Sequence, residues 1–269
     1  MTTPPTLPDE RILWRHLMDL PYFRAMVRAV EDAFYQGLSL PGPVLDLGSG
    51  DGHFASVAFQ HPLDVGLDPW WGPLRESKDR QAYRLLTQAD GGRMPFADGA
   101  FASAVSNSVL EHIPHVESVL AETARVVKPG GRFVFCVPNH RFPQLLMGRE
   151  VFSRLGLKGA AENYTRLFQR ISRHVHCDSR EVWAARLAAA GFEIEQAWDY
   201  FPREALHRME AGHAFGLPAL VSKKITGRWV LARNRANLSL AYRITREVFN
   251  HPKSEEGVYS FYITRRTAA

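Results

Sequence analysis

The stretch Val-Leu-Asp-Leu-Gly-Ser-Gly-Asp-Gly at residues 44–52 restricts the fold of this 269-residue chain more than any other feature. Apart from Asp46, its first four residues are apolar, and three glycines follow at alternate positions, Gly48, Gly50 and Gly52. An apolar run that ends in closely spaced glycines is typical of a buried strand followed by a turn that a ligand can approach closely. We therefore expect a strand, a ligand-binding turn and a helix in direct succession.

The rest of the chain continues this alternation of strands and helices. Two helices are predicted at 9–20 and 21–37, and seven strands at 44–47, 64–67, 84–88, 102–106, 132–137, 192–198 and 258–264. Further helices are predicted at 53–60, 116–127 and 178–190, the last opened by a capping box of Asp178 and Glu181. This order predicts an α/β fold with a doubly wound, seven-stranded, mostly parallel sheet.

The order of these predicted elements divides the chain into four parts. They are an N-terminal helical cap (1–40), a ligand-binding core (41–200), a helical insertion or lid (201–257) and the last strand of the core (258–269).

The glycine spacing distinguishes between two classes of ligand. A dinucleotide site requires G-x-G-x-x-G, in which the third glycine allows close packing of the helix. That position is His53 in this chain, and Asp46 lies where it would repel a pyrophosphate. A carboxylate suits a ligand that carries an ammonium and a sulfonium. The pattern D-x-G-x-G-x-G is that of class I S-adenosylmethionine-dependent methyltransferases.

Four more motifs follow in order. They are Asp68 at the end of the second strand, Asp90-Gly91 after the third, Ser106 to Ile113 after the fourth, and Val126 to Gly131 before the fifth. Over residues 42–138, and more weakly to 198, the chain resembles the small-molecule "type 11" branch of these methyltransferases, which includes enzymes of quinone biosynthesis. The resemblance implies S-adenosyl-L-methionine as the cofactor and a small or amphiphilic metabolite as the acceptor.

The resemblance also implies roles for individual residues. Asp46 and the turn of Gly48, Gly50 and Gly52 should hold the methionine moiety, and Asp68 the ribose diol. Trp70 should lie against the adenine, with Asp90 and Gly91 near its amino group. Ser106 and Asn107 should contact the methionine end. We expect Trp71 to pack in the core.

Catalytic residues are less evident, because methyl transfer from a sulfonium depends mainly on the alignment of acceptor and methyl group. A general base is needed for a hydroxyl acceptor, but hardly for a carboxylate, a thiolate or a stabilised enolate. The candidates are His112, after the fourth strand, and His140, just past the fifth.

Several acceptors are disfavoured by missing residues. The Asn/Asp-Pro-Pro-aromatic turn of nucleobase amine methyltransferases is replaced by Asn107-Ser108-Val109-Leu110. A second cysteine to accompany Cys136, as methylation of RNA pyrimidines at C5 requires, is missing after the fourth strand. Methylation of arginine would use paired glutamates, of which only Glu111 is near the right place. A small or lipid-like acceptor remains, and nucleic acid is an unlikely partner.

Composition adds further limits. Hydrophobic residues make up 45% and charged residues 23%, and no run of 18 apolar residues or signal-peptide pattern is present, so we expect a cytoplasmic protein. Cys136 and Cys177 do not form a CxxC motif, which argues against a disulfide framework or a metal site. We expect both to be small buried residues. Nothing in the sequence indicates an oligomeric state.

The net charge of +5 is concentrated in the predicted insertion. Residues 203–246 contain nine basic residues and two acidic ones. We expect this segment to form a lid whose Lys223, Lys224 and Arg228 face an anionic acceptor or an anionic membrane surface. Two other functions stay open: an RNA-directed methyltransferase or a catalytically silent binding protein that uses this segment, and a nicotinamide enzyme.

Overall fold

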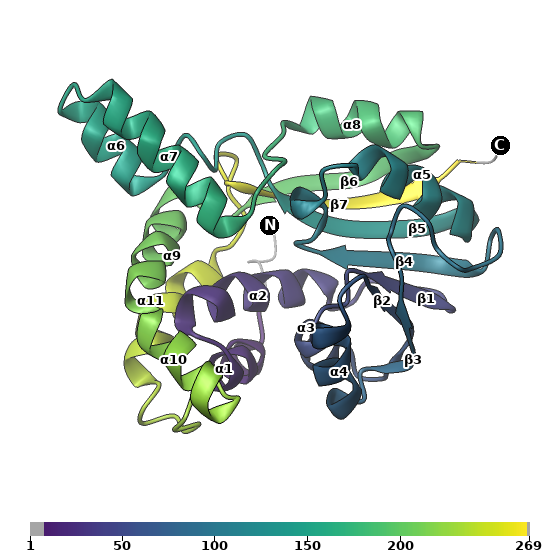
Figure 1. The fold of residues 1–269 in the computed structure, drawn as a ribbon, viewed down its shortest axis with the longest axis horizontal. Helices are drawn as coiled ribbons and strands as arrows, with labels where there is room; N and C mark the ends of the chain where they lie inside the picture. The colour runs from purple at the N-terminus through teal and green to yellow at the C-terminus, as the bar shows by residue number, and fades with distance from the viewer. Residues whose placement is uncertain (1–7, 268–269) are drawn as a thin grey trace, which may run out of the picture.

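The central sheet has the strand order β3-β2-β1-β4-β5-β7-β6 in the computed structural model, which describes residues 8–267 (Figure 1). The strands are β1 (Val44–Leu47), β2 (Leu63–Asp68), β3 (Tyr83–Gln88), β4 (Phe101–Asn107), β5 (Val127–Pro138), β6 (Phe192–Tyr200) and β7 (Tyr259–Arg266). Only β7 runs antiparallel to its neighbours β5 and β6. The predicted seven-stranded, mostly parallel sheet is confirmed.

The strand order reverses beside β1, which pairs with β2 on one side and β4 on the other. Such a reversal opens a crevice at the carboxyl ends of the strands, where doubly wound sheets bind their ligands. The glycine turn after β1 lies at this point.

Helices cover both faces of the sheet. Helices α5 (Val116–Val126) and α8 (Arg180–Ala189) cover one face, where Phe133, Phe135 and Val137 of β5 are buried. The other face is covered by α1 (Glu10–Asp19), α2 (Tyr22–Tyr35) and α3 (His53–Ala58), and here Val134 and Cys136 point into the core. The alternation along β5 follows from the period of two residues in a strand.

The insertion before β7 is helical, as predicted, with α9 (Arg203–Phe215), α10 (Leu217–Thr226) and α11 (Ser239–Asn250). Helices α9 and α11 pack on α2, so the insertion and the N-terminal helices form one layer. The approach of α9 is close, because a Cβ atom at Gly212 would lie 2.4 Å from Phe23.

Three helices were not predicted from the sequence. Helix α4 (Trp71–Arg80) follows β2, and α6 (Met147–Arg154) and α7 (Lys158–Ser172) form a helical hairpin between β5 and α8. Figure 1 shows this hairpin standing out from the body of the molecule. It is anchored by Glu210 of α9, whose carboxylate accepts hydrogen bonds from the backbone N–H groups of Met147 and Gly148 and from the Tyr164 hydroxyl.

Two local predictions are wrong. Ser179, and not Asp178, is the N-cap residue of α8, because the Asp178 carboxylate instead pairs with Arg186. Trp71 is not a core residue: it begins α4 and is 63% exposed. Both cysteines were expected to be buried; Cys136 is buried, but Cys177 is only partly buried.

No described helix is both long and apolar enough to cross a membrane. Residues 1–7, on which the search for a signal peptide partly rested, lie outside the described range.

Candidate active site

The glycine turn after β1 is fixed to β2 and open on its outer side. The backbone N–H groups of Gly48 and Ser49 donate to the carbonyl of Leu67 at 2.8 and 2.9 Å. A Cβ atom at Gly48 would lie 2.3 Å from Val109, so only glycine fits there. At Gly50, where φ is +55°, a Cβ atom would meet nothing within 4 Å. This open side of the turn is where a ligand can approach the backbone.

Two carboxylates flank the turn. Asp46 is 4% exposed and accepts a hydrogen bond from the Tyr83 hydroxyl at 2.5 Å. Burial raises the pKa of Asp46 to about 6, although the Tyr83 hydrogen bond opposes the rise. Asp68 ends β2 and accepts hydrogen bonds from the N–H groups of Gly50 and Trp70. Asp68 therefore holds the glycine turn as well as facing the crevice.

The residues predicted to contact the adenine lie at the carboxyl ends of β2 and β3. Trp70 is 71% exposed beside Asp68, and Asp90 is also exposed, with its carboxylate accepting from the Gly92 N–H at 2.7 Å. Gly91 is buried, since a Cβ atom there would lie 3.0 Å from Leu47. The predicted cofactor residues thus follow one another along the carboxyl ends of β1, β2 and β3.

S-adenosylmethionine fits these residues. The turn has open space at Gly50, the buried hydroxyl of Ser49 has no hydrogen-bond partner in the described structure, and Asp46 supplies a carboxylate for a cationic group. Asp68, at the end of the second strand, suits a ribose diol.

The end of β4 is occupied by a buried polar network. The hydroxyl of Ser106 donates to the carbonyl of Leu47, and the Asn107 amide donates to Glu31 of α2. Glu31 also accepts hydrogen bonds from Arg28, Ser108 and Tyr200. The side chains of Ser106 and Asn107 are therefore engaged within the protein, and their predicted contact with the cofactor stays a prediction.

Glu31 and Arg28, which join this network from α2, were not predicted from the sequence. The Arg28 guanidinium binds Glu31 at 2.7 Å and also interacts electrostatically with Glu111. Glu31 is already hydrogen-bonded to this internal arginine. Helical spacing could have revealed Glu31, because it lies four residues after Val27 on the apolar face of α2.

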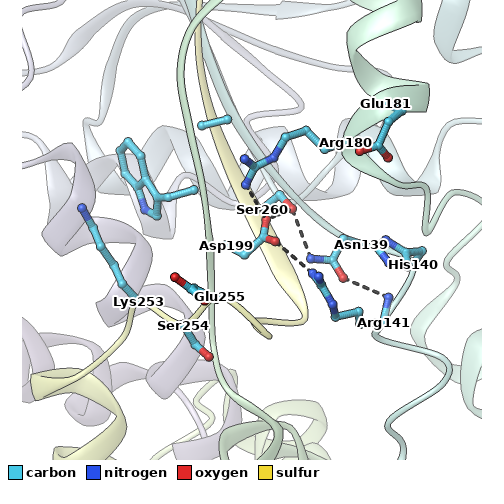
Figure 2. Close-up of a pocket in the computed structure, with 12 residues that line it drawn as sticks. Asn139, His140, Arg141, Arg180, Glu181, Asp199, Lys253, Ser254, Glu255 and Ser260 are labelled. Carbon is cyan, nitrogen blue, oxygen red and sulfur yellow. Dashed lines mark hydrogen bonds and ion pairs between the residues drawn. The ribbon is translucent and has the colours of Figure 1, made fainter.

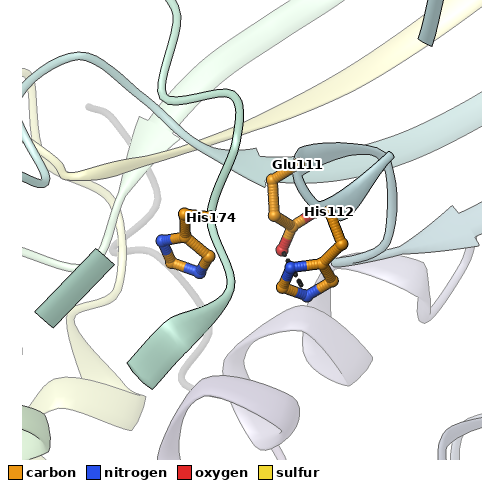
Figure 3. A group of neighbouring side chains, drawn as sticks. All are labelled: Glu111, His112 and His174. Atoms are coloured by element: carbon orange, nitrogen blue, oxygen red, sulfur yellow. Dashed lines mark ion pairs between the residues drawn. The ribbon is translucent and has the colours of Figure 1, made fainter. Parts of the chain in front are cut away.

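Beyond the end of β4 lies a group of three side chains. Glu111 and His112 belong to a short 3₁₀ turn, Leu110–His112, and His174 lies opposite them on the segment after α7 (Figure 3). Burial raises the pKa of Glu111 to about 8, and burial together with the nearby His112 lowers that of His174 to about 3. Glu111 and His112 follow shortly after Val109, which packs against Gly48 of the glycine turn.

The other predicted catalytic residue, His140, is located elsewhere. It lines a cavity of about 610 Å³ at the ends of β5 and β6, together with Asn139, Arg141 and Arg180. Figure 2 shows Asp199 between the two arginines, which both bind its carboxylate at 3.0 Å. None of the predicted cofactor-binding residues lines this cavity. The structure does not bring His140 and the glycine turn into one site.

The chain has relatives among proteins of known activity. It is 28% identical over 225 residues to malonyl-[acyl-carrier protein] O-methyltransferase of Geobacter sulfurreducens, which covers 77% of this chain and 79% of that protein. Over 98 residues it is 36% identical to the ubiquinone/menaquinone biosynthesis C-methyltransferase of Desulfotalea psychrophila. That match covers 35% of this chain and only 40% of the relative.

Solved structures share the fold. Geranyl diphosphate C-methyltransferase from Streptomyces coelicolor, crystallised with Mg²⁺, geranyl diphosphate and S-adenosyl-L-homocysteine, aligns with a TM-score of 0.55 at 15% identity. The alignment covers 91% of this chain and 84% of that one. A family model described as a methyltransferase domain matches residues 14–197, which is more than half of the chain. The chain therefore belongs to the methyltransferase domain family and is a class I S-adenosylmethionine-dependent methyltransferase.

Proposed function

We propose that this enzyme transfers a methyl group from S-adenosylmethionine to a small, amphiphilic acceptor bound beside Glu111, His112 and His174. The observation that carries the proposal is the contact between Gly48 of the glycine turn and Val109, which lies two residues before Glu111 in the chain. The names of the relatives support it, since they refer to malonyl-[acyl-carrier protein] and to the biosynthesis of ubiquinone and menaquinone.

The cofactor supplies an electrophilic methyl group, and the protein must align the acceptor with it. Asp46 would hold the methionine moiety of the cofactor, and Asp68 its ribose diol. The His174 ring packs edge-on against the buried ring of Phe142, with the ring centroids 4.9 Å apart. For a hydroxyl acceptor, His112 would accept the proton when no metal ion occupies its free ring nitrogen.

The insertion is less suited to an anionic membrane than its sequence indicates. Five of its nine basic residues pair with acidic side chains: Arg203 with Glu150, Arg208 with Glu247, Lys223 with Glu76, Arg233 with Asp19 and Arg246 with Glu10. Two of these pairs connect the insertion to α1, and one connects it to α4. These ion pairs support an insertion that packs on α1 and α4 and whose basic side chains are largely neutralised by acidic partners.

We propose the α6–α7 hairpin, in place of the insertion, as the membrane-facing surface. Several of its exposed apolar residues are spaced four apart: Met147 and Val151 on α6 with Leu155 just after it, and Leu167 and Ile171 on α7. On both helices this stripe lies beside the helix–helix contact of Gly148 with Tyr164, so the two stripes share one face. Residues 147–173 contain six basic residues and two acidic ones. We propose that this face contacts an anionic bilayer from which the acceptor is drawn.

The experiment is a screen for the acceptor. The purified enzyme is incubated with isotope-labelled S-adenosylmethionine and with either extracted lipids or water-soluble metabolites, and the variant Asp68→Ala serves as the control. We expect label in a lipid-soluble product that depends on Asp68. Label in RNA, or steeply salt-dependent retention on a polyanion, would support the RNA-directed alternative instead.

A further inference from the structure

We propose that Glu111, His112 and His174 bind a divalent transition-metal ion of the zinc type at the acceptor end of the site. One potential ligand atom from each residue lies within 4.8 Å of the others. Figure 3 shows the carboxylate above the His112 ring and the His174 ring facing both from the opposite segment.

The first support is the state of the Glu111 carboxylate. Glu111 is 1% exposed, and its Oε2 atom is buried without a hydrogen-bond partner in the described structure. A buried carboxylate oxygen without a donor is costly, unless a cation or a proton satisfies it. The guanidinium of Arg28 is instead hydrogen-bonded to Glu31 and to the carbonyl of Asn107.

The second support is the orientation of His112. Its Nδ1 atom lies 3.0 Å from the carbonyl oxygen of Arg173. Because a carbonyl only accepts hydrogen bonds, Nδ1 carries the proton and Nε2 keeps its lone pair. This Nε2 atom lies 3.7 Å from Glu111 Oε1. Histidines that bind metals are commonly oriented in this way, with the second ring nitrogen donating to a carbonyl.

The third support is the fixed position of His174. Its backbone N–H donates to the carbonyl of Gln169 at 3.0 Å, and its ring packs edge-on against Phe142 at 4.9 Å. Its ring centroid lies 5.5 Å from that of His112. Two segments distant in sequence therefore present their imidazoles to one carboxylate.

Two imidazoles and a carboxylate form a ligand set that zinc uses at sites with an open fourth position. Zinc bonds of about 2.0–2.1 Å at tetrahedral angles place ligand atoms about 3.3 Å apart, so binding would draw the three side chains together. The open position would take an oxygen of the acceptor. Only this last role depends on the proposed function; binding of the metal does not.

The test uses untagged, metal-stripped protein without cofactor or acceptor. Calorimetry with Zn²⁺ and absorption spectra with Co²⁺ should show one bound ion per chain, and Mg²⁺ should bind more weakly, since it prefers oxygen ligands. The variants Glu111→Gln, His112→Gln and His174→Gln should each weaken Zn²⁺ binding at least about tenfold. His251→Gln, which removes an exposed histidine, is the matched control and should bind like the unaltered protein.

Circular dichroism and S-adenosylhomocysteine binding show whether each variant is folded. A folded double variant, His112→Gln with His174→Gln, that still binds one Zn²⁺ would overturn the proposal. So would unaltered protein that binds no Zn²⁺ or Co²⁺ at micromolar concentrations. Failure of S-adenosylhomocysteine to bind the unaltered protein would instead contradict the proposed function and leave the metal site standing.

Discussion

Asp46 lies at the end of β1 with the Tyr83 hydroxyl as its hydrogen-bond donor, and burial raises its pKa to about 6. A cationic ligand group favours the ionised carboxylate, so ligand binding below pH 6 must also displace a proton from Asp46. We expect the affinity for S-adenosylhomocysteine to be constant above about pH 7. It should fall by up to about tenfold per pH unit below pH 6, as measured by calorimetry.

The variant Asp46→Asn separates this effect from other titrations. It should bind more weakly at neutral pH, but its affinity should change little between pH 5 and 7. An unchanged decline in the variant would assign the titration to another group.

Glu31 is the residue on which the buried network at the end of β4 depends. Its carboxylate accepts hydrogen bonds from Arg28, Asn107, Ser108 and Tyr200. Replacing Glu31 with Ala leaves the Arg28 guanidinium without its paired carboxylate, and we expect a loss of about 3–5 kcal/mol in the free energy of unfolding. Urea denaturation measures this loss.

Glu162→Ala, which alters an exposed glutamate on α7, is the control for Glu31→Ala and should change the unfolding free energy by less than about 0.5 kcal/mol. A loss below about 1 kcal/mol in Glu31→Ala would show that the network does not stabilise the fold.

Among single residues, those of the glycine turn were predictable because they lie in one short motif. Gly48 and Gly50 adopt positive φ values of 78° and 55°, as the spacing of the motif requires. The roles predicted for Asp46 and Asp68 as cofactor ligands stay predictions. Glu31 was missed because its partners come from β4 and β6, and the sequence alone does not show where α2 packs.

The α6–α7 hairpin is an addition between β5 and α8 that was not predicted from the sequence. If its apolar face contacts a bilayer, the double variant Leu167→Ser with Ile171→Ser should lose most of its binding to anionic vesicles, since each large apolar side chain contributes about 1.5–3 kcal/mol on burial. Both residues are more than half exposed, so folding should be unaffected. Cosedimentation with vesicles of phosphatidylglycerol and phosphatidylcholine measures the binding.

The triple variant Lys223→Ser, Lys224→Ser and Arg228→Ser tests the surface that the sequence favoured. We expect it to retain most vesicle binding, because Lys223 already pairs with Glu76. If vesicle binding is lost in this variant and retained in the hairpin variant, the membrane-binding surface is the insertion. A dimer that disappears in the hairpin variant would identify the face as a contact between two copies of the chain.

β1 and the buried part of β5 were predictable because each is a short apolar run next to a glycine turn, and most observed strand bounds differ from the predicted ones by a few residues. The hairpin was not, because its apolar residues alternate with arginines and half of them face outward. The prediction of Asp178 as a helix cap was wrong because a cap pattern in sequence is local. The Asp178 carboxylate pairs with Arg186, a contact that depends on the position of α8.

At the scale of the whole molecule, the N-terminal helices, the insertion and the sheet form one body around the crevice. A buried chain of polar groups joins three of the helices, with His16 of α1 between Asp32 of α2 and His53 of α3 at 3.0 and 3.2 Å. Such contacts connect residues far apart in sequence, and sequence patterns do not show them. The doubly wound order, in contrast, follows from the alternation of elements, which is why the crevice beside β1 could be predicted.

The most direct test of the central claim compares two ligands in one thermal unfolding measurement. A ligand present at 100 times its dissociation constant stabilises the folded state by about 2.7 kcal/mol. For a chain of this size, S-adenosylhomocysteine should therefore raise the melting temperature by roughly 5 °C or more, and NAD should not change it. A rise with NAD and none with S-adenosylhomocysteine would contradict the assignment of the glycine turn and the proposed methyl transfer.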